Sequence, residues 1–437
     1  MTGPHDPAGS GLSPRRRKEV LDALRRGTVP YNGLDVLAVG LRRFEPTADD
    51  ELATVCAGGA VFKAVRGEYG SGKTFFARWL GERAKRRGMA VAEVQISETQ
   101  TPLHRLETVY RRVCESLQTA EFPPSALRPV LDAWLYTLEE EAGSQVDAVL
   151  EQRLASVSRT TPAFASALRA YRAAQQDGGV ATAEGLVAWL GGQPHVAATV
   201  RQRAGVRGQL DHFGAVGFLQ GLLTVLRDSG HPGLLLVLDE VETLQRTRGD
   251  VRDKALNALR QLIDEVDSGR FPGLYLLTTG TPAFFDGTQG AQRLPPLAQR
   301  LATDFTTDPR FDNPRAVQLR LPGFTIDGLR ELGGRVRDLF MAGLPDAERI
   351  AGQVDDEYLT TLADAVTGRL GGKVGIVPRV FLKKLVADVL DRVELHADFD
   401  PRRHYQLTLT AAELTEVERN AAGLVARSVD DIELDLP

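Results

Sequence analysis

The sequence has little of what marks secreted, membrane-bound or strongly basic proteins. Its only cysteines, Cys56 and Cys114, lack the spacing of metal ligands or of a disulfide framework, so we expect buried thiols in a reducing cytoplasm. No run of about 18 apolar residues occurs, and we therefore predict no membrane-spanning helix. The net charge of −5 excludes a globally basic surface for nucleic acid but leaves a local patch open.

The first residues, Met1 to Ser13, are rich in glycine, proline and serine and lack the apolar core of a signal peptide. We expect a disordered tail over residues 1–14 of a cytoplasmic protein. The basic run of residues 15–18 follows. It either touches nucleic acid or begins a solvated helix, and the second interpretation is the more common case for such a run.

The chain alternates short apolar segments with helical patterns, which is typical of an α/β protein with a parallel sheet. Its length predicts two or three domains at roughly 100–200 residues each. The apolar segments predict strands at 61–66, 91–96, 234–238, 274–279 and 316–319. Helices are expected at 18–26, 46–57, 74–87 and 251–268.

Two further regions are predicted to be almost entirely helical. The first, about 103–227, interrupts the strand pattern as a large insertion. The second, 326–400, forms a C-terminal helical lid domain. We therefore expect a core domain over 15–325 and a tail with a short strand, at 405–409, over 401–437.

Residues 67–74 match G-x-x-x-x-G-K-[ST] between a predicted strand and a predicted helix. Glycines let the loop turn tightly, so that backbone N–H groups and the helix N-terminus face phosphate oxygens. Lys73 can then reach the β- and γ-phosphates, and the Thr74 hydroxyl can ligate Mg²⁺. The residues expected to contact the nucleotide here are Gly67, Glu68, Tyr69, Gly70, Ser71, Gly72, Lys73, Thr74 and Phe75.

An acidic pair follows the most apolar of the predicted strands, 234–238. A carboxylate at the end of a buried strand beside a P-loop can hold Mg²⁺, and we assign that role to Asp239. The next residue, Glu240, is the expected catalytic base that polarises the attacking water. Glu242 is a poorer candidate for the base and is expected to serve the structure.

Four further polar residues have two open interpretations each. Thr279 and Thr281, after the next strand, either sense the γ-phosphate or satisfy the backbone of a turn. Arg300 acts in trans as an arginine finger at a subunit boundary, or it forms a surface salt bridge. Arg379, in residues 375–379, couples nucleotide state to the lid, or it faces solvent at a helix start.

These motifs in this order resemble the AAA+ ATPases, especially those related to initiator and transposition-helper ATPases, over about Thr28 to Val393. The resemblance implies a Walker A motif at Lys73 and Thr74 and a Walker B motif at Asp239 and Glu240. Sensor 1 would be Thr279 or Thr281, and sensor 2 would be Arg379. It also implies ATP and Mg²⁺ as cofactors, a homo-oligomer, and hydrolysis of ATP to ADP and phosphate.

A closer resemblance rests on 26–30, on Gly33-Leu34, on 38–40 and on the P-loop. These segments resemble the ATP-binding proteins of bacterial phage-exclusion (BREX) systems. That family implies a role in antiviral defence, with DNA and other defence proteins as possible partners. The resemblance also implies that residues 28–34, including Val29 and Pro30, lie along the adenine ring.

The chain departs from a minimal AAA+ core because Asp239 follows Lys73 by 166 residues. A core of this kind needs on the order of 50–60 residues there. We expect the inserted helices to form a partner or substrate surface. Three hypotheses follow: a motor or switch acting with DNA or DNA-modifying partners, a switch that recruits proteins without touching DNA, and, fitting less well, a small-molecule kinase.

Overall fold

The computed structural model describes residues 11–369 and 377–408, and the chain divides into two compact units. The sheet unit comprises residues 46–66 and 83–319. The P-loop unit comprises the described parts of 1–45, 67–82 and 320–437. The units are therefore not the contiguous ranges into which we divided the sequence. Most of the expected N-terminal tail, and the C-terminal tail from residue 409, lie outside the described residues.

The sheet has five strands in the order β2-β3-β4-β1-β5. The bounds are β1 Val61–Arg66, β2 Ala90–Gln95, β3 Leu234–Asp239, β4 Leu274–Gly280 and β5 Gln318–Arg320. The β1–β4, β2–β3 and β3–β4 pairs are parallel, as predicted. Their registers place Arg66 opposite Gly280 and Leu238 opposite Thr278, so β1, β3 and β4 end at one edge of the sheet.

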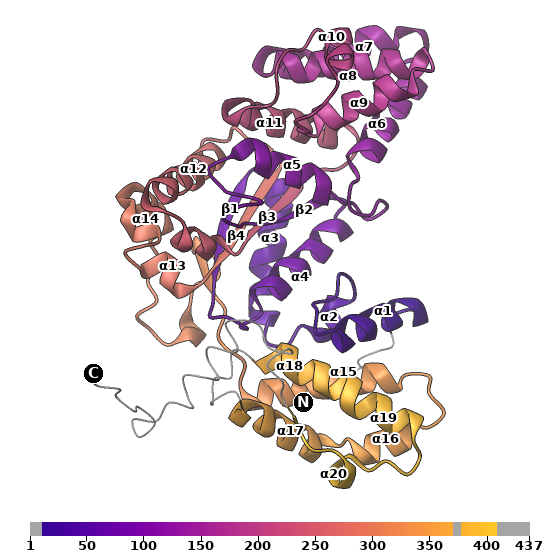
Figure 1. The fold of residues 1–437 in the computed structure, drawn as a ribbon, viewed down its shortest axis with the longest axis vertical. Coiled ribbons are helices and arrows are strands. Elements are labelled where there is room, and N and C mark those ends of the chain that lie inside the picture. Colours follow the sequence, from indigo (N-terminus) through magenta and orange to yellow (C-terminus); the bar gives the residue numbers. More distant parts are fainter. Residues whose placement is uncertain (1–10, 370–376, 409–437) are drawn as a thin grey trace, which may run out of the picture. The chain divides into compact units, whose positions relative to one another are not determined.

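Helices cover the sheet and explain why β3 is apolar up to its last residue, Asp239 (Figure 1). Every residue of β3 and β4 is buried. α5 packs on β2, and α12 packs on β1. A parallel strand covered on both faces gains most from an uninterrupted apolar run. The helices around the sheet are α3 Glu45–Cys56, α12 Gly249–Asp267, α13 Pro282–Asp286 and α14 Pro295–Leu301.

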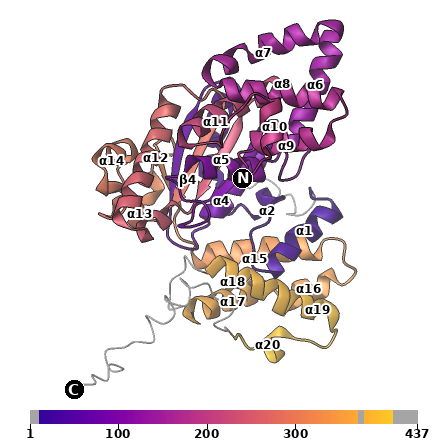
Figure 2. The same ribbon diagram turned by 45° about the horizontal axis from the view of Figure 1, so that its top comes forward.

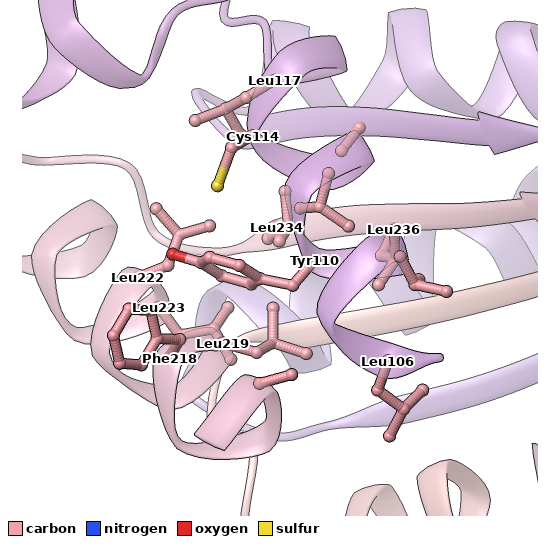
Figure 3. Packing of buried hydrophobic residues seen from close by; sticks show 14 of the residues in the cluster. Leu106, Tyr110, Cys114, Leu117, Phe218, Leu219, Leu222, Leu223, Leu234 and Leu236 are labelled. Atoms are coloured by element: carbon pink, nitrogen blue, oxygen red, sulfur yellow. The ribbon is translucent and has the colours of Figure 1, made fainter. Parts of the chain in front are cut away.

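The region between β2 and β3 is helical, as predicted. Its helices are α5 Leu106–Ser116, α6 Leu127–Ala142, α7 Val146–Thr160, α8 Pro162–Gln176, α9 Val180–Leu190, α10 Ala198–Arg203 and α11 His212–Asp228. Figure 3 shows α5 and α11 packed together over β3, with Tyr110 and Phe218 facing each other. Their rings meet edge to face with centroids 5.7 Å apart. The insertion therefore shares one continuous apolar core with the sheet.

The two cysteines differ in burial. Cys114 lies in the core beside Tyr110, and burial raises the pKa of its thiol to about 12. Cys56, at the end of α3, is only partly buried. The expectation of buried thiols is therefore confirmed for Cys114 alone. No described helix is long and apolar enough to span a membrane.

The P-loop unit combines the first helices of the chain with those at its C-terminal end (Figure 2). Its helical segments are α1 Pro14–Arg25, α2 Leu34–Leu37, the first part of α4 Lys73–Arg86, α15 Ile326–Met341, α16 Ala347–Gln353, α17 Asp356–Arg369, α18 Val377–Lys383, the π-helix η7 Lys384–Leu390, α19 Asp391–Leu395 and α20 Pro401–His404. α1 contributes Val20, Leu21 and Leu24 to the apolar core of the C-terminal helices. Arg25 also donates two hydrogen bonds of 2.8 Å to the Asp391 carboxylate.

The strand predicted at 405–409 is wrong for its described part. The short helix α20 ends at His404, and residues 405–408 are not in a strand. Tyr405 and Leu407 pack against the apolar core of the unit. In this extended segment every second side chain contacts the core. This produces the alternating apolar pattern of a strand, although residues 405–408 pair with no other strand.

Candidate nucleotide-binding site

The glycine loop after β1 has a backbone that only glycine allows at several positions. Gly70 and Gly72 have φ of 78° and 92°, in the left-handed region. At Gly67 a Cβ atom would lie 2.2 Å from Ser71 Oγ, which is closer than atoms can approach. The loop is therefore wound tightly enough to exclude any side chain at its first position.

The Lys73 side chain lies across this loop and is buried. Its ammonium group donates to the carbonyl oxygens of Gly67, at 2.9 Å, and Glu68, at 3.2 Å. It also lies 5.1 Å from the centroid of the Tyr69 ring. The lysine is thus held with its charge at the loop, where a polyphosphate tail would find both backbone N–H groups and a cation.

Three side chains of α4 hold the N-terminal segment in the same unit. Arg78 donates to the Val29 carbonyl oxygen at 2.7 Å, and its guanidinium lies 4.2 Å from the Tyr31 ring centroid. Trp79 Nε1 donates to Asp35 Oδ1 at 2.9 Å. The Glu82 carboxylate accepts the N–H groups of residues 33 and 34, at 3.0 and 2.8 Å. The helix that begins with Lys73 therefore fixes residues 29–35.

A large pocket of about 1410 Å³ lies within the P-loop unit. Its lining includes Ser71, Gly72 and Phe75 of the loop and the start of α4, together with residues 38–44 and 321–325. Val29 and Pro30, which we expected along the adenine ring, are not among the lining residues. The neighbouring segment 38–44 lines the pocket in their place.

The carboxyl edge of the sheet contains the predicted acidic pair. Asp239 and Thr279 are both buried, and the Thr279 hydroxyl donates a hydrogen bond to Asp239 Oδ1. The same hydroxyl accepts the backbone N–H of Glu240 at 3.1 Å. Thr279 therefore fixes the Asp239 carboxylate and the backbone of the next residue at once. Thr281 is also buried and begins α13 as its N-cap residue.

Glu240 has a left-handed backbone, with φ of 60° and ψ of 45°. Its carboxylate accepts a hydrogen bond of 2.9 Å from the side-chain amide of Gln95, at the end of β2. Gln95 is not among the site residues predicted from the sequence. A polar residue at the carboxyl end of the strand beside β3 was the available signal, since parallel strands end at a common edge.

The two candidate arginines have different surroundings. Arg300, in α14, forms an ion pair with Asp264 of α12 and donates to the carbonyl oxygen of Pro296 at 2.7 Å. Arg379, in α18, lies beside Gly27, where a Cβ atom would be 3.4 Å from Arg379 Nη1. Residues 375 and 376 of the motif around Arg379 lie outside the described residues.

The strands that precede the P-loop and the acidic pair in the sequence end at the same edge of the sheet. β1 ends at Arg66, and the loop begins at the next residue. Because β4 alone separates β1 from β3, the ends of β1 and β3 are two strand spacings apart, roughly 10 Å. The chain therefore enters the phosphate-binding loop from the same sheet edge that presents Asp239.

Several solved structures are similar to this chain at low identity. They include an Aeropyrum pernix ORC2 protein in ADPNP–ADP complexes, with 14% identity, a TM-score of 0.34, and coverage of 79% of this chain and 67% of that chain. An A. pernix ORC1 protein in complex with DNA has 15% identity, a TM-score of 0.31, and coverage of 80% and 66%. Drosophila ORC bound to DNA has 13% identity, a TM-score of 0.30, and coverage of 89% and 70%.

The sequence comparison with protein families is more informative. No curated protein matches the chain. The family described as "BREX system ATP-binding protein BrxC/D" matches residues 12–409, which is most of the chain and includes both the P-loop and the acidic pair. The parallel sheet and the glycine loop agree with the AAA+ fold expected from the sequence. The chain belongs to this family of ATP-binding proteins of BREX systems.

Proposed function

We propose that this protein hydrolyses ATP with Mg²⁺ and that the cycle of ATP binding and hydrolysis lets it act as a motor or switch in antiphage defence. The observation that carries the proposal is the hydrogen-bond chain at the sheet edge, in which Thr279 holds both Asp239 and the backbone of Glu240. A fixed carboxylate followed directly by a second one suits metal binding and water activation. The glycine loop supplies the complementary phosphate site.

The described residues fit ATP and Mg²⁺ by their chemistry. Gly67 leaves no room for a side chain inside the loop, and Lys73 already donates to carbonyl oxygens that phosphate oxygens can replace. The Thr74 hydroxyl and the Asp239 carboxylate are the oxygen ligands that would hold the metal. When bound, Mg²⁺ would neutralise phosphate charge. Glu240 would orient and deprotonate the attacking water. Thr279 would hold the Asp239 carboxylate and the backbone of Glu240 in fixed positions relative to each other.

The adenine would occupy the pocket of the P-loop unit, with Phe75 as an apolar wall. Val29 and Pro30 would support this pocket through α4 and Arg78. Arg379 would report nucleotide state to the lid, and Arg300 would serve a neighbouring subunit of a homo-oligomer once released from Asp264. Thr281 would join Thr279 in sensing the γ-phosphate.

DNA or DNA-modifying proteins are the partners that we propose for this cycle. A second candidate is an ATP-dependent switch that recruits proteins without touching DNA. The net charge of −5 and the large helical insertion favour this alternative. DNA binding separates the two, because contacts to phosphates weaken steeply with salt.

Two substitutions test the ATPase proposal. Lys73→Ala should abolish ATP binding, and Glu240→Gln should retain ATP but lower turnover at least about a hundredfold, since a general base contributes roughly 10²–10⁴-fold. Isothermal titration and phosphate release would measure the two effects. Asp250→Asn changes an exposed carboxylate at the start of α12 and serves as the control. Turnover by Glu240→Gln at the wild-type rate would exclude Glu240 as the base.

A further inference from the structure

A stretch of the helical insertion is basic in an otherwise acidic chain. Between Glu184 and Asp211 the sequence has no acidic residue but has Arg201, Arg203 and Arg207. The segment runs through α10 to the start of α11. Local charge of one sign on an acidic protein suggests a surface that meets a polyanion.

These arginines are not neutralised by carboxylates in the part of the chain that the structure describes. Arg203 donates to the Thr182 hydroxyl at 2.9 Å, and Arg201 donates to the Gly208 carbonyl oxygen at 3.0 Å. Arg207 is exposed and takes part in no ion pair within the described ranges. Many other arginines of the sheet unit, such as Arg153 and Arg169, pair with carboxylates. The contrast leaves the positive charge available to a ligand.

The backbone of this segment is also open. Gly205 and Gly208 flank Arg207 with φ of 65° and 73°, and a Cβ atom at either position would meet nothing within 4 Å. Both glycines therefore leave the main chain accessible to close approach by a ligand. Because the Gly205 N–H already donates to the Gln202 carbonyl oxygen at 3.0 Å, phosphate groups would be contacted mainly by the arginines.

The segment ends in an unusually exposed aromatic side chain. Phe213 is 81% exposed, and its ring contacts the His212 ring edge to face with centroids 5.4 Å apart. Both residues stand on the first turn of α11, whose other face is fixed against α5 in the core (Figure 3). An aromatic ring held on a rigid helix and left uncovered suits stacking by a nucleic-acid base.

Charged groups of both signs lie near this point. Burial lowers the pKa of His104, and the nearby charges of Arg105 and Lys254 lower it further, whereas the Glu107 carboxylate raises it. The nearest acid along the segment is Asp211, whose carboxylate accepts the Gly214 N–H at 2.7 Å as a helix cap. Because Glu107 and Asp211 stand beside the nearby cations, the positive charge available to a ligand comes mainly from Arg203 and Arg207.

We propose that the surface formed by Arg203, Arg207, His212 and Phe213, the 203–213 surface, binds single-stranded DNA, with arginines on phosphates and Phe213 stacked on a base. Arg207 and Phe213 are six residues apart, so they lie within about 21 Å of each other, a span of a few nucleotides. This inference rests on the DNA-linked form of the proposed function and names the surface that it would use.

Fluorescence anisotropy with a labelled oligo(dT) and with a labelled duplex tests the inference. At about 50 mM KCl the full-length protein should bind oligo(dT), with affinity falling as salt rises. Phe213→Ala should weaken oligo(dT) binding about tenfold through lost stacking, and should affect the duplex less. Arg203→Ala with Arg207→Ala should weaken both and flatten the salt dependence.

Matched controls come from another exposed arginine–phenylalanine pair in the sheet unit. Phe311 is 68% exposed, and Arg310 lies 4.8 Å from its ring centroid. Arg310→Ala and Phe311→Ala should leave DNA affinity unchanged. If the wild type and the 203–213 variants bind DNA with equal affinity, the protein binds DNA, but the 203–213 surface is not the site. Absence of any binding by wild type, with ATP hydrolysis retained, would overturn both this surface and the DNA-linked form of the function.

Discussion

At the scale of single residues, Glu240 has the most costly backbone of the proposed site. It and Ser125 are the only non-glycine residues with positive φ in the described ranges. A left-handed conformation costs an L-residue roughly 1–2 kcal/mol. Strain of this kind is kept where the side chain has a function to perform. Substitutions of Glu240 should therefore change the stability of the protein and its ATPase activity in different directions.

Replacing Glu240 by glycine should stabilise the protein by about 1 kcal/mol while stopping ATP turnover, because glycine adopts positive φ without strain. Glu240→Gln keeps the strained backbone and should lose turnover without the gain in stability. Denaturant unfolding of the two variants beside wild type measures the difference. Equal stability of the glycine and glutamine variants would show that the backbone of Glu240 is not strained.

Some residues of the proposed site follow from local sequence patterns, and others do not. The glycine loop and the acidic pair were recognisable because their spacing is local. Gln95 reaches Glu240 across 145 positions of sequence, and only the pairing of β2 with β3 brings them together. The pocket lining at 38–44 likewise depends on how the P-loop unit folds, whereas Val29 and Pro30 had only a resemblance to support them.

At the scale of elements, apolar runs located β1 to β4 within about one residue at most of their ends. The predicted starts of α3, α4 and α12 lie within two residues of the observed ones, and only the start of α1 was further off. α1 begins at Pro14 after the capping residue Ser13, rather than at residue 18, because three arginines and a lysine hid its first turn. The strand predicted at 405–409 is wrong over residues 405–408 for a different reason. An alternating pattern shows which side chains are buried, but it does not show that a hydrogen-bonded neighbouring strand exists.

One ion pair links the end of β1 to the helix that follows β4. Arg66 donates to both carboxylate oxygens of Asp286 in α13, and its guanidinium lies 4.7 Å from the Phe305 ring centroid. The Arg66 side chain is only 10% exposed, whereas Asp286 is 61% exposed. The pair therefore joins the strand entering the P-loop to the segment after Thr281.

A double-mutant cycle on Arg66→Ala and Asp286→Ala should give a coupling energy of about 1 kcal/mol, reduced by the exposure of Asp286. The exposed pair of Arg310 and Asp308 provides the comparison and should show no measurable coupling. Unfolding free energies of the four proteins in each cycle supply the values. Additive effects at Arg66 and Asp286 would mean that burial of the arginine alone stabilises this junction.

At the scale of the whole molecule, the chain passes between the two units four times, after residues 45, 66, 82 and 319. The helix α1 belongs with the C-terminal helices because Val20, Leu21 and Leu24 are buried among them. Sequence reading could not find this arrangement, since the two partners are more than 300 residues apart. A division at residue 325 thus cuts through one apolar core.

Truncation of the chain after residue 325 should therefore yield an aggregating protein, because the apolar face of α1 loses its cover. Co-expression of residues 326–437 should restore solubility by re-forming that core. Size-exclusion chromatography of the truncated chain, alone and with the C-terminal piece, measures both outcomes. A monodisperse truncated chain would mean that α1 does not need the C-terminal helices.

The adjacency of β2 and β3 has a consequence for how this protein can diversify. A parallel crossover between neighbouring strands requires one helix, and α5 and α11 already provide two. The outward faces of α6 to α9 are thus released from closing the sheet, and they can change sequence while the ATP-binding residues stay constant. Relatives of this protein should therefore differ from one another most on these outward helix faces.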